Sequence, residues 1–345
     1  MKFVPHNYQR YCINRMITDP VLGLFLDMGL GKTVITLTAV NDLRFNRFAV
    51  RKVLVIAPKK VAEDTWTRES QKWDHLKMLR VIPVLGSIKQ RIRAINTPGD
   101  IWVLSRDNVS WLVDYYKNDW PFDMVIIDEL SSFKSNKAKR FRKLKSVRSH
   151  IHRIVGLTGT PTPNGLEDLW AQIYLLDEGK RLGKTLTGYR DNYFTPGARN
   201  GNVVYEYNPR TWADEEINER IKDICISMKA EDYLELPERI DNVRHIKLPD
   251  KAKKQYEELE KTMIADIDGE TIDVTSAAAL SNKLLQLCNG AVYDADGIYH
   301  EVHDEKIEAL KEIIDANAGK GILVFYNFKH DKARIQKALK KSKLR

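Results

Sequence analysis

The sequence has few cysteines and no long apolar segment. Its three cysteines, Cys12, Cys225 and Cys288, are far apart and odd in number, which argues against a disulfide framework or a zinc cluster. The eight histidines show no metal-ligand spacing. Every apolar run is far shorter than the ~20 residues of a membrane-spanning helix, and the N-terminus lacks the apolar core of a signal peptide. We therefore expect a soluble protein of a reducing, intracellular compartment.

The composition is that of an ordinary globular protein. The chain has 345 residues, of which 43% are hydrophobic and 30% are charged, so it can hold two domains with real cores. Its net charge of +9 favours a polyanionic partner, although many basic proteins bind none. No internal repeat or low-complexity segment is present.

Short apolar runs alternate with longer polar stretches of helical length. This alternation predicts a parallel sheet wrapped by helices, which is an α/β fold. Ligands of such sheets gather at the carboxyl ends of the strands, where the chemically suggestive residues of this chain also lie. The predicted strands are Val53–Ala57, Val81–Leu85, Ile101–Leu104, Met124–Ile127 and Ile154–Leu157.

A glycine turn with a lysine and a hydroxyl lies between an apolar run, Val21–Leu26, and a helix-compatible run, Val34–Val40. Glycines let backbone N–H groups close on nucleotide phosphates, the lysine neutralises the β- and γ-phosphates, and the hydroxyl is offered to Mg²⁺. This pattern predicts a phosphate loop, with Lys32 in a catalytic role and Thr33 at the metal. The residues predicted to hold the nucleotide are Met28, Gly29, Leu30, Gly31, Lys32 and Thr33.

The match to the usual phosphate-loop pattern is imperfect. A glycine is expected five residues before Gly31, and the chain has Leu26 there, so Gly29 must supply the flexibility. The alternative is an ordinary glycine turn between a strand and a helix.

A second motif favours the nucleotide site over that alternative. The apolar run from Phe122 ends in Asp128 and Glu129, as a buried parallel strand with acids at its carboxyl end would. We predict that Asp128 holds Mg²⁺ and that Glu129 orients or deprotonates the attacking water. A merely polar strand end is the alternative, which the phosphate loop about a hundred residues upstream makes much weaker.

The second part of the sequence has a different character. Residues 177–238 are polar and aromatic with several helix breakers, and we interpret them as an inserted region of a first domain spanning residues 1–240. Residues 241–345 are expected to begin a second α/β domain that is incomplete. Its predicted elements are helices at Lys251–Asp266, Ser276–Cys288, Lys306–Ala316 and Asp331–Lys341 and a strand at Ile322–Tyr326.

Together these motifs resemble the Swi/Snf-type members of helicase superfamily 2, especially compact phage or bacterial versions. The resemblance runs nearly the whole length of the chain. Besides the phosphate loop and Asp128-Glu129-Leu130-Ser131, the matching segments are Pro5-His6-Asn7-Tyr8-Gln9, Val53 to Pro58 with Trp66 and Glu69, Gly156 to Asn164, Leu234 to Pro237, Leu284 to Asn289 and Ile322 to Tyr326.

The resemblance implies a RecA-like ATPase lobe followed by an incomplete second RecA-like lobe, with ATP and Mg²⁺ bound in a cleft between the lobes. It implies an ATP-dependent motor, expected to be a monomer, that acts on double-stranded DNA without sequence preference. Gln9 would contact the adenine base, and Thr158, Gly159 and Thr160 would couple hydrolysis to movement. The cytoplasm of a bacterial or phage-infected cell is the expected location, and the nucleus stays open.

Nucleic-acid contacts are expected at strand ends and in a basic segment. The segment from Lys134 to Arg153 has nine Lys or Arg and no acid, and it is either a solvated helix face or, as the resemblance implies, close to the duplex. Lys59, Ser105 and Arg106 would suit phosphate oxygens rather than base edges. We predict DNA contacts at Lys59, Ser105, Arg106 and Lys134.

Two departures from the family pattern bear on activity. Ser131 stands where the family often has a histidine that links hydrolysis to the later motif around Thr158. The motifs that supply an arginine to the γ-phosphate would lie beyond Arg345, so the chain as given is expected to hydrolyse ATP weakly. A longer chain that includes those motifs is expected to restore hydrolysis. A strand-separating DNA or RNA helicase and a non-catalytic, nucleotide-gated DNA-binding fragment remain the alternatives.

Overall fold

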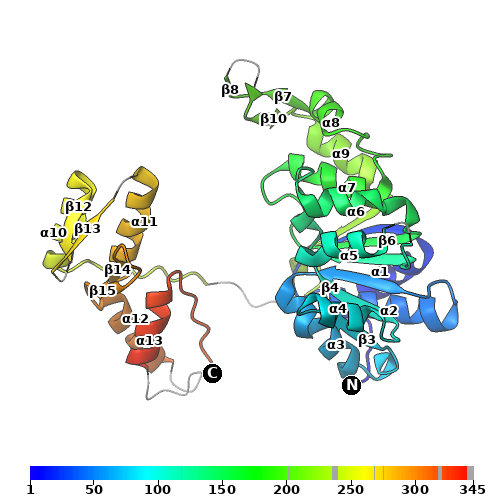
Figure 1. The fold of residues 1–345 in the computed structure, drawn as a ribbon, viewed down its shortest axis with the longest axis horizontal. Helices are drawn as coiled ribbons and strands as arrows, with labels where there is room; N and C mark the ends of the chain where they lie inside the picture. The colour runs from blue at the N-terminus through cyan, green and yellow to red at the C-terminus, as the bar shows by residue number, and fades with distance from the viewer. Residues whose placement is uncertain are drawn as a thin grey trace. The chain divides into compact units, whose positions relative to one another are not determined.

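The computed structural model describes residues 1–117, 119–200, 203–234, 240–267, 269–274, 276–317 and 321–339. The chain divides into two compact units, Met1–Pro237 and Glu238–Arg345. Figure 1 shows both units and labels many of their helices and strands. Residues 235 to 237, part of the segment expected to lead into a second lobe, lie outside the described residues.

The first unit is built on a seven-stranded sheet whose order is β11-β1-β6-β5-β2-β4-β3. Every neighbouring pair in this sheet is parallel. The predicted α/β class with a parallel sheet is thus confirmed, because each predicted run of this unit forms a strand. The strands are β1 Val21–Leu26, β2 Val53–Ala57, β3 Val81–Val84, β4 Ile101–Ser105, β5 Met124–Asp128, β6 Arg153–Thr158 and β11 Cys225–Met228.

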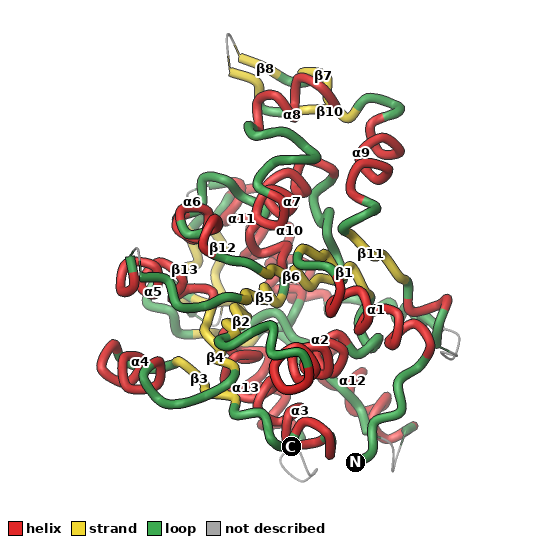
Figure 2. Tube along the Cα trace, turned by 90° about the vertical axis from the view of Figure 1, so that its right-hand side faces the viewer, coloured by secondary structure: helices red, strands yellow, loops and turns green. Residues whose placement is uncertain are grey.

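Helices cover both faces of this sheet, and each face has its own core. Successive strand residues point to opposite faces, so Val55 of β2 packs in one core while Leu54 and Ile56 pack in the other. Figure 2 shows β5 and β6 between α5 and α6 on one side and α1 and α2 on the other. The covering helices are α1 Asn7–Thr18, α2 Lys32–Asn41, α3 Trp66–Lys72, α4 Ile88–Ile95, α5 Val109–Tyr116, α6 Lys139–Ser146 and α7 Leu169–Asp177.

The region expected to be an insertion is mixed, and its last strand belongs to the main sheet. In Figure 1 its small hairpins and α8 lie beyond α7, away from the main sheet. Its elements are α8 Leu186–Tyr193, β7 Phe194–Pro196, β8 Arg199–Asn200, β9 Val203–Val204, β10 Tyr207–Pro209 and α9 Ala213–Ile221. The chain then returns as β11, in which Cys225 lies beside Gly23 of β1. A Cβ at Gly23 would lie 3.0 Å from the Cys225 sulfur, so glycine relieves a tight contact between the two strands.

The second unit has a small core around Leu259, Ile272 and Leu287. The helix predicted at 251–266 is too long, because it ends at Thr262, where Met263 has a left-handed φ of 60°. Ile264–Ile267 instead pairs with the next strand. The elements are α10 Asp250–Thr262, β12 Ile264–Ile267, β13 Glu270–Asp273, α11 Ala277–Cys288, β14 Ala291–Tyr293, β15 Tyr299–Glu301, α12 Glu305–Ala316 and α13 Lys329–Ala338.

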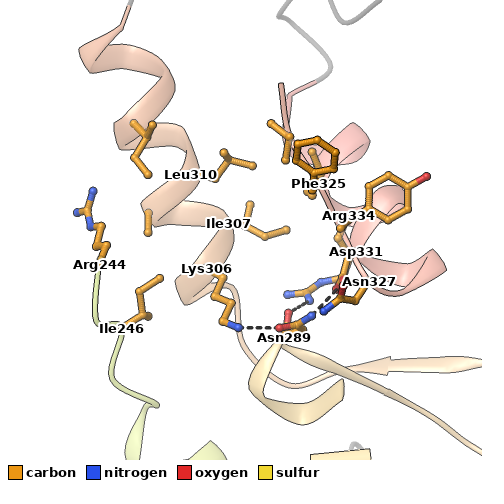
Figure 3. Close-up of a pocket in the computed structure, with 15 residues that line it drawn as sticks. Arg244, Ile246, Asn289, Lys306, Ile307, Leu310, Phe325, Asn327, Asp331 and Arg334 are labelled. Carbon is orange, nitrogen blue, oxygen red and sulfur yellow. Dashed lines mark hydrogen bonds between the residues drawn. The ribbon is translucent and has the colours of Figure 1, made fainter. Parts of the chain in front are cut away.

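The strand predicted at Ile322–Tyr326 is wrong for this structure. These residues form neither a helix nor a strand and have no hydrogen-bonded partner strand among the described residues, and Phe325 is 86% exposed. A cavity of about 420 Å³ separates them from α12. Figure 3 shows Ile307 and Leu310 of α12 facing the segment that carries Phe325. An apolar run is therefore not sufficient for a strand, since a strand also needs a neighbour for its backbone groups.

No helix among the described residues has the length and apolar character needed to cross a membrane.

Candidate active site

The candidate site lies at the carboxyl edge of three adjacent strands of the first unit. In the sheet, β6 lies between β1 and β5. Phe25 is level with Thr158, and Asp128 is level with Leu157. Because parallel strands present their carboxyl ends at one edge, the segments that follow β1, β5 and β6 meet there.

The predicted phosphate loop connects β1 to α2 with two glycines in left-handed conformations. Gly29 has a φ of 86° and Gly31 a φ of 79°, values that a residue with a Cβ adopts only under strain. A Cβ at Gly31 would also lie 2.8 Å from the Gln9 amide nitrogen. Leu30 is fully buried and Met28 is 85% exposed, so Leu30 anchors the loop in the core.

Lys32 begins α2 and folds its side chain back over the loop. Its ammonium donates hydrogen bonds to the carbonyl oxygens of Leu26, at 2.6 Å, and Asp27, at 3.1 Å. Burial lowers the pKa of Lys32, while the nearby charges of Asp128 and Glu129 oppose that effect. The cation is thus held by two neutral acceptors, which an anionic phosphate can replace at a gain in charge-assisted hydrogen bonding. Thr33 follows in the first turn of α2.

Gln9 lies on the first turn of α1 and is 7% exposed. Its amide oxygen accepts a hydrogen bond from the His6 backbone N–H at 3.0 Å, and its amide nitrogen donates to the Leu30 carbonyl at 3.4 Å. The Tyr8 hydroxyl donates to the same carbonyl at 3.3 Å. The start of α1 is therefore fastened to the phosphate loop, next to Gly31.

Asp128 ends β5 and accepts a hydrogen bond from the indole of Trp66, at the start of α3. The Trp66 side chain, which is fully buried, donates its Nε1–H to Asp128 Oδ2 at 3.0 Å. Burial raises the pKa of Asp128 above its ordinary value, while the indole hydrogen bond and the Lys32 charge act in the opposite direction. Asp128 is therefore a carboxylate that would ionise more readily beside a further cation.

Glu129 follows Asp128. Its backbone is strained, and one of its carboxylate oxygens accepts two hydrogen bonds. Its φ of 63° is left-handed, which is uncommon for a residue with a side chain. Glu129 Oε1 accepts a hydrogen bond from the Thr158 hydroxyl at 2.9 Å and another from the Ser131 hydroxyl. No described residue donates a hydrogen bond to Oε2, so one carboxylate oxygen is fixed and the other is available.

The end of β6 and the turn after it, which together contain Thr158, Gly159 and Thr160, touch both motifs. The Thr160 backbone N–H donates to the Thr158 hydroxyl at 3.1 Å. A Cβ at Gly159 would lie 3.3 Å from the Leu26 carbonyl oxygen and 3.8 Å from the Lys32 ammonium. The three segments named as candidates from the sequence are therefore in mutual contact.

The phosphate loop is also bonded to the chain that leaves β11. The Ala230 backbone N–H donates to the Asp27 carboxylate at 2.9 Å, and the Asp27 N–H donates to the Met228 carbonyl at 3.1 Å. The ring of Tyr233 lies 4.9 Å from that of Tyr8. This link between residues about two hundred positions apart had no signal in the sequence.

The four residues predicted to contact DNA differ widely in exposure. The Lys59 side chain is 74% exposed and lies 4.0 Å from Glu63, and Arg106 is half-buried. Lys134 pairs with Asp168 at 3.3 Å. Ser105 is only 2% exposed, so its hydroxyl could reach a phosphate only if its neighbours moved. These assignments stay predictions.

The basic segment from Lys134 to Arg153 has structural as well as solvated members. Arg148 is buried and donates to the carbonyls of Leu175 and Leu176. Arg153 donates to three carbonyls at the end of α1 and just after it. The exposed members are Lys137, Lys139, Arg142 and Lys145. Only part of the segment is thus free to meet a polyanion.

Sequence reasoning noted Trp66 without a role and treated Ser131 only as a missing histidine. In the structure the Trp66 indole donates a hydrogen bond to the Asp128 carboxylate, and the Ser131 hydroxyl donates one to the Glu129 carboxylate. A hydroxyl two residues after Glu129 was a readable signal, because a short turn can bring it back to the carboxylate. The Trp66 contact had none, since 62 residues separate the two partners.

Comparison with known proteins identifies the family of the chain. The SNF2-related domain family matches residues 8–291. The putative protein p41 of Acyrthosiphon pisum secondary endosymbiont phage 1 is 37% identical over 99% of this chain and 76% of its own length. The bovine DNA annealing helicase and endonuclease ZRANB3 is 29% identical over a match that covers 71% of this chain and 23% of that protein.

The fold has a solved counterpart. The Sulfolobus solfataricus SWI2/SNF2 ATPase core in complex with dsDNA matches with a TM-score of 0.57 and 22% identity, over 99% of this chain and 71% of that one. At this identity the structural match shows only the fold, which is the RecA-like fold that the resemblance implied. Membership of the family rests on the match to the family model. The chain therefore belongs to the SNF2-related family and carries that family's ATPase core.

Proposed function

We propose that this chain is an ATP-dependent motor that translocates along double-stranded DNA. The observation that carries the proposal is the contact of three segments at one sheet edge. There Lys32 lies on the phosphate loop beside Gly159, and Thr158 donates a hydrogen bond to Glu129. A cation, a metal-binding carboxylate and a free carboxylate oxygen within one site are the groups that phosphoryl transfer to water requires.

The residues have distinct roles in this proposal. Backbone N–H groups of the loop from Met28 to Thr33 hold the phosphates, and Lys32 moves from the Leu26 and Asp27 carbonyls to the β- and γ-phosphates. Glu129 orients a water molecule and takes its proton as the water oxygen bonds to the γ-phosphorus. The bond from that phosphorus to the β–γ bridging oxygen breaks, and ADP keeps the electron pair.

The residues at the site fit Mg²⁺. Mg²⁺ is usually bound by one or two carboxylates together with substrate phosphates and water, and it needs no cage of protein ligands. Asp128 supplies a carboxylate that is oriented by Trp66, and Thr33 supplies a hydroxyl at the start of α2. When bound there, the ion would offset the negative charge of the phosphates. Gln9, beside the loop, is the proposed adenine contact.

Duplex DNA is the proposed track. The Sulfolobus solfataricus core was solved in complex with dsDNA, and the present chain has exposed lysines and arginines near the same sheet edge and along α6. Lys59, Arg106 and Lys134 are proposed to contact phosphate oxygens, with Ser105 dependent on local movement. Contacts of this kind give binding that falls steeply with salt and depends little on sequence.

The test compares phosphate release with no nucleic acid, duplex DNA, single-stranded DNA and RNA. We expect the largest stimulation by duplex DNA, of any sequence. Displacement of a third strand from a triplex, without separation of a plain duplex, would then identify translocation. Separation of the duplex strands would instead identify a helicase, and nucleotide-dependent DNA binding without any phosphate release would identify a non-catalytic binding module.

A further inference from the structure

The carboxylate of Glu129 is held from two sides at a single oxygen. Thr158 and Ser131 both donate their hydroxyl protons to Oε1. The hydroxyl of Thr158 accepts a hydrogen bond from the Thr160 backbone N–H, which leaves its own proton for Glu129. Two donors on Oε1 fix the orientation of the carboxylate and leave Oε2 without a donor from either hydroxyl.

Ser131 is held in place by the turn that contains it. The turn η5, Leu130–Phe133, is closed by a hydrogen bond of 2.9 Å from the Ser132 backbone N–H to the Glu129 carbonyl. Leu130 is fully buried against Gly156 of β6, where a Cβ would lie 2.5 Å from a Leu130 methyl carbon. The backbone of Ser131 is thus fixed relative to β6 and so to Thr158.

We propose that Ser131 is a positioning residue for hydrolysis: with Thr158 it fixes Glu129 Oε1 so that Oε2 faces the attacking water. This assignment rests on the proposed function. Ser131 stands at the position where family members often carry a histidine, and Thr158 at the end of β6 bonds the same carboxylate oxygen. Ser131 itself does not touch the reacting atoms.

The test is single-turnover phosphate release with protein in excess over ATP and with duplex DNA present, because this registers even slow hydrolysis. Loss of a hydrogen bond to a charged group predicts that Ser131→Ala slows the chemical step on the order of tenfold, with ATP affinity unchanged. Ser131→Thr keeps the hydroxyl and should restore the rate. The neighbouring Ser132 hydroxyl has no hydrogen-bond partner among the described residues, so Ser132→Ala is the matched control and should behave as the parent.

A second measurement separates positioning from a general effect on the fold. In a Glu129→Gln background the base is already lost, so adding Ser131→Ala should slow phosphate release no further. An additional tenfold loss there, or equal losses for Ser131→Ala and Ser132→Ala, would overturn the assignment. A Ser131→Ala protein with the parental rate would overturn it while leaving the proposed function intact. A parent that releases no phosphate would overturn both.

Discussion

The indole of Trp66 donates a hydrogen bond of 3.0 Å to the carboxylate of Asp128. Trp66 begins α3 and Asp128 ends β5, so the bond joins a helix and a strand that are far apart in the sequence. Burial raises the pKa of Asp128, and this donor is what opposes the rise most strongly. The bond therefore keeps a buried carboxylate closer to the ionised state that a metal ion requires.

Replacing Trp66 by phenylalanine should impair the metal site. The change leaves Asp128 Oδ2 without its indole donor, which costs about 1–3 kcal/mol of folding free energy and raises the pKa of Asp128 further. We expect a higher Mg²⁺ concentration for half-maximal nucleotide binding, measured by titration with a fluorescent ATP analogue. Trp73→Phe is the matched control, because it removes a similar 3.0 Å bond, to Glu69, that does not involve Asp128. Equal effects of the two changes would contradict the role given to Trp66.

Lys32→Ala should weaken ATP binding while the fold persists. A charge-assisted contact to phosphate contributes about 1.5–3 kcal/mol, so the dissociation constant should rise roughly 10- to 150-fold. Isothermal titration calorimetry measures the affinity, and circular dichroism checks the fold. Lys89→Ala, on the exposed face of α4, removes the same charge far from the loop in the sequence and should bind ATP as the parent does. Unchanged ATP affinity in a folded Lys32→Ala protein would rule out the phosphate-loop assignment.

Glu129→Gln should separate binding from hydrolysis. The amide keeps the size of the side chain and an oxygen that Thr158 and Ser131 can still donate to, but it cannot take a proton. ATP binding should therefore persist while phosphate release falls by about 10²–10⁴-fold. A variant that hydrolyses ATP at the parental rate would show that another group is the base.

A buried carboxylate in the first unit should make stability depend on pH. Asp100 is 2% exposed and accepts hydrogen bonds from the Arg80 backbone N–H, the Arg80 guanidinium and the Arg44 guanidinium. Burial acts to raise the pKa of Asp100, but the hydrogen bonds and charge of Arg80, together with Arg44, outweigh it. The pKa therefore lies below the ordinary value of 3.8.

Because the folded-state pKa of Asp100 is depressed, its ionised form stabilises the protein above pH 3.8, and this stabilisation is lost as pH falls further. Asp100→Asn should lower the free energy of unfolding by about 1–3 kcal/mol near neutral pH. The difference from the parent should shrink as the pH falls below the ordinary carboxyl value. The measurement is urea unfolding of the parent and the variant near neutral pH and again below the ordinary carboxyl pKa. Asp74→Asn, which removes an exposed partner of Lys77, should change little at either pH.

Much of the first unit could be predicted from local pattern. The runs Val53–Ala57 and Met124–Ile127 are short, apolar and bounded by polar residues, so they had to be buried strands of a parallel sheet. β11 escaped prediction because Cys225–Met228 is short and follows a polar region. It pairs with β1 with Cys225 level with Gly23, where glycine relieves a tight contact. In the second unit Ile322–Tyr326 had the composition of a strand but no partner among the described residues.

The sequence by itself determined which groups the site contains: a glycine loop with Lys32, and the acids Asp128 and Glu129 after an apolar run. Residue type and spacing suffice for this, because phosphate and metal chemistry restrict the usable side chains. Only the tertiary structure decided how those groups are held. The bonds from Trp66 to Asp128 and from Thr158 to Glu129 join residues 62 and 29 positions apart. Such bonds depend on which strands are neighbours in the sheet, and no local pattern encodes that order.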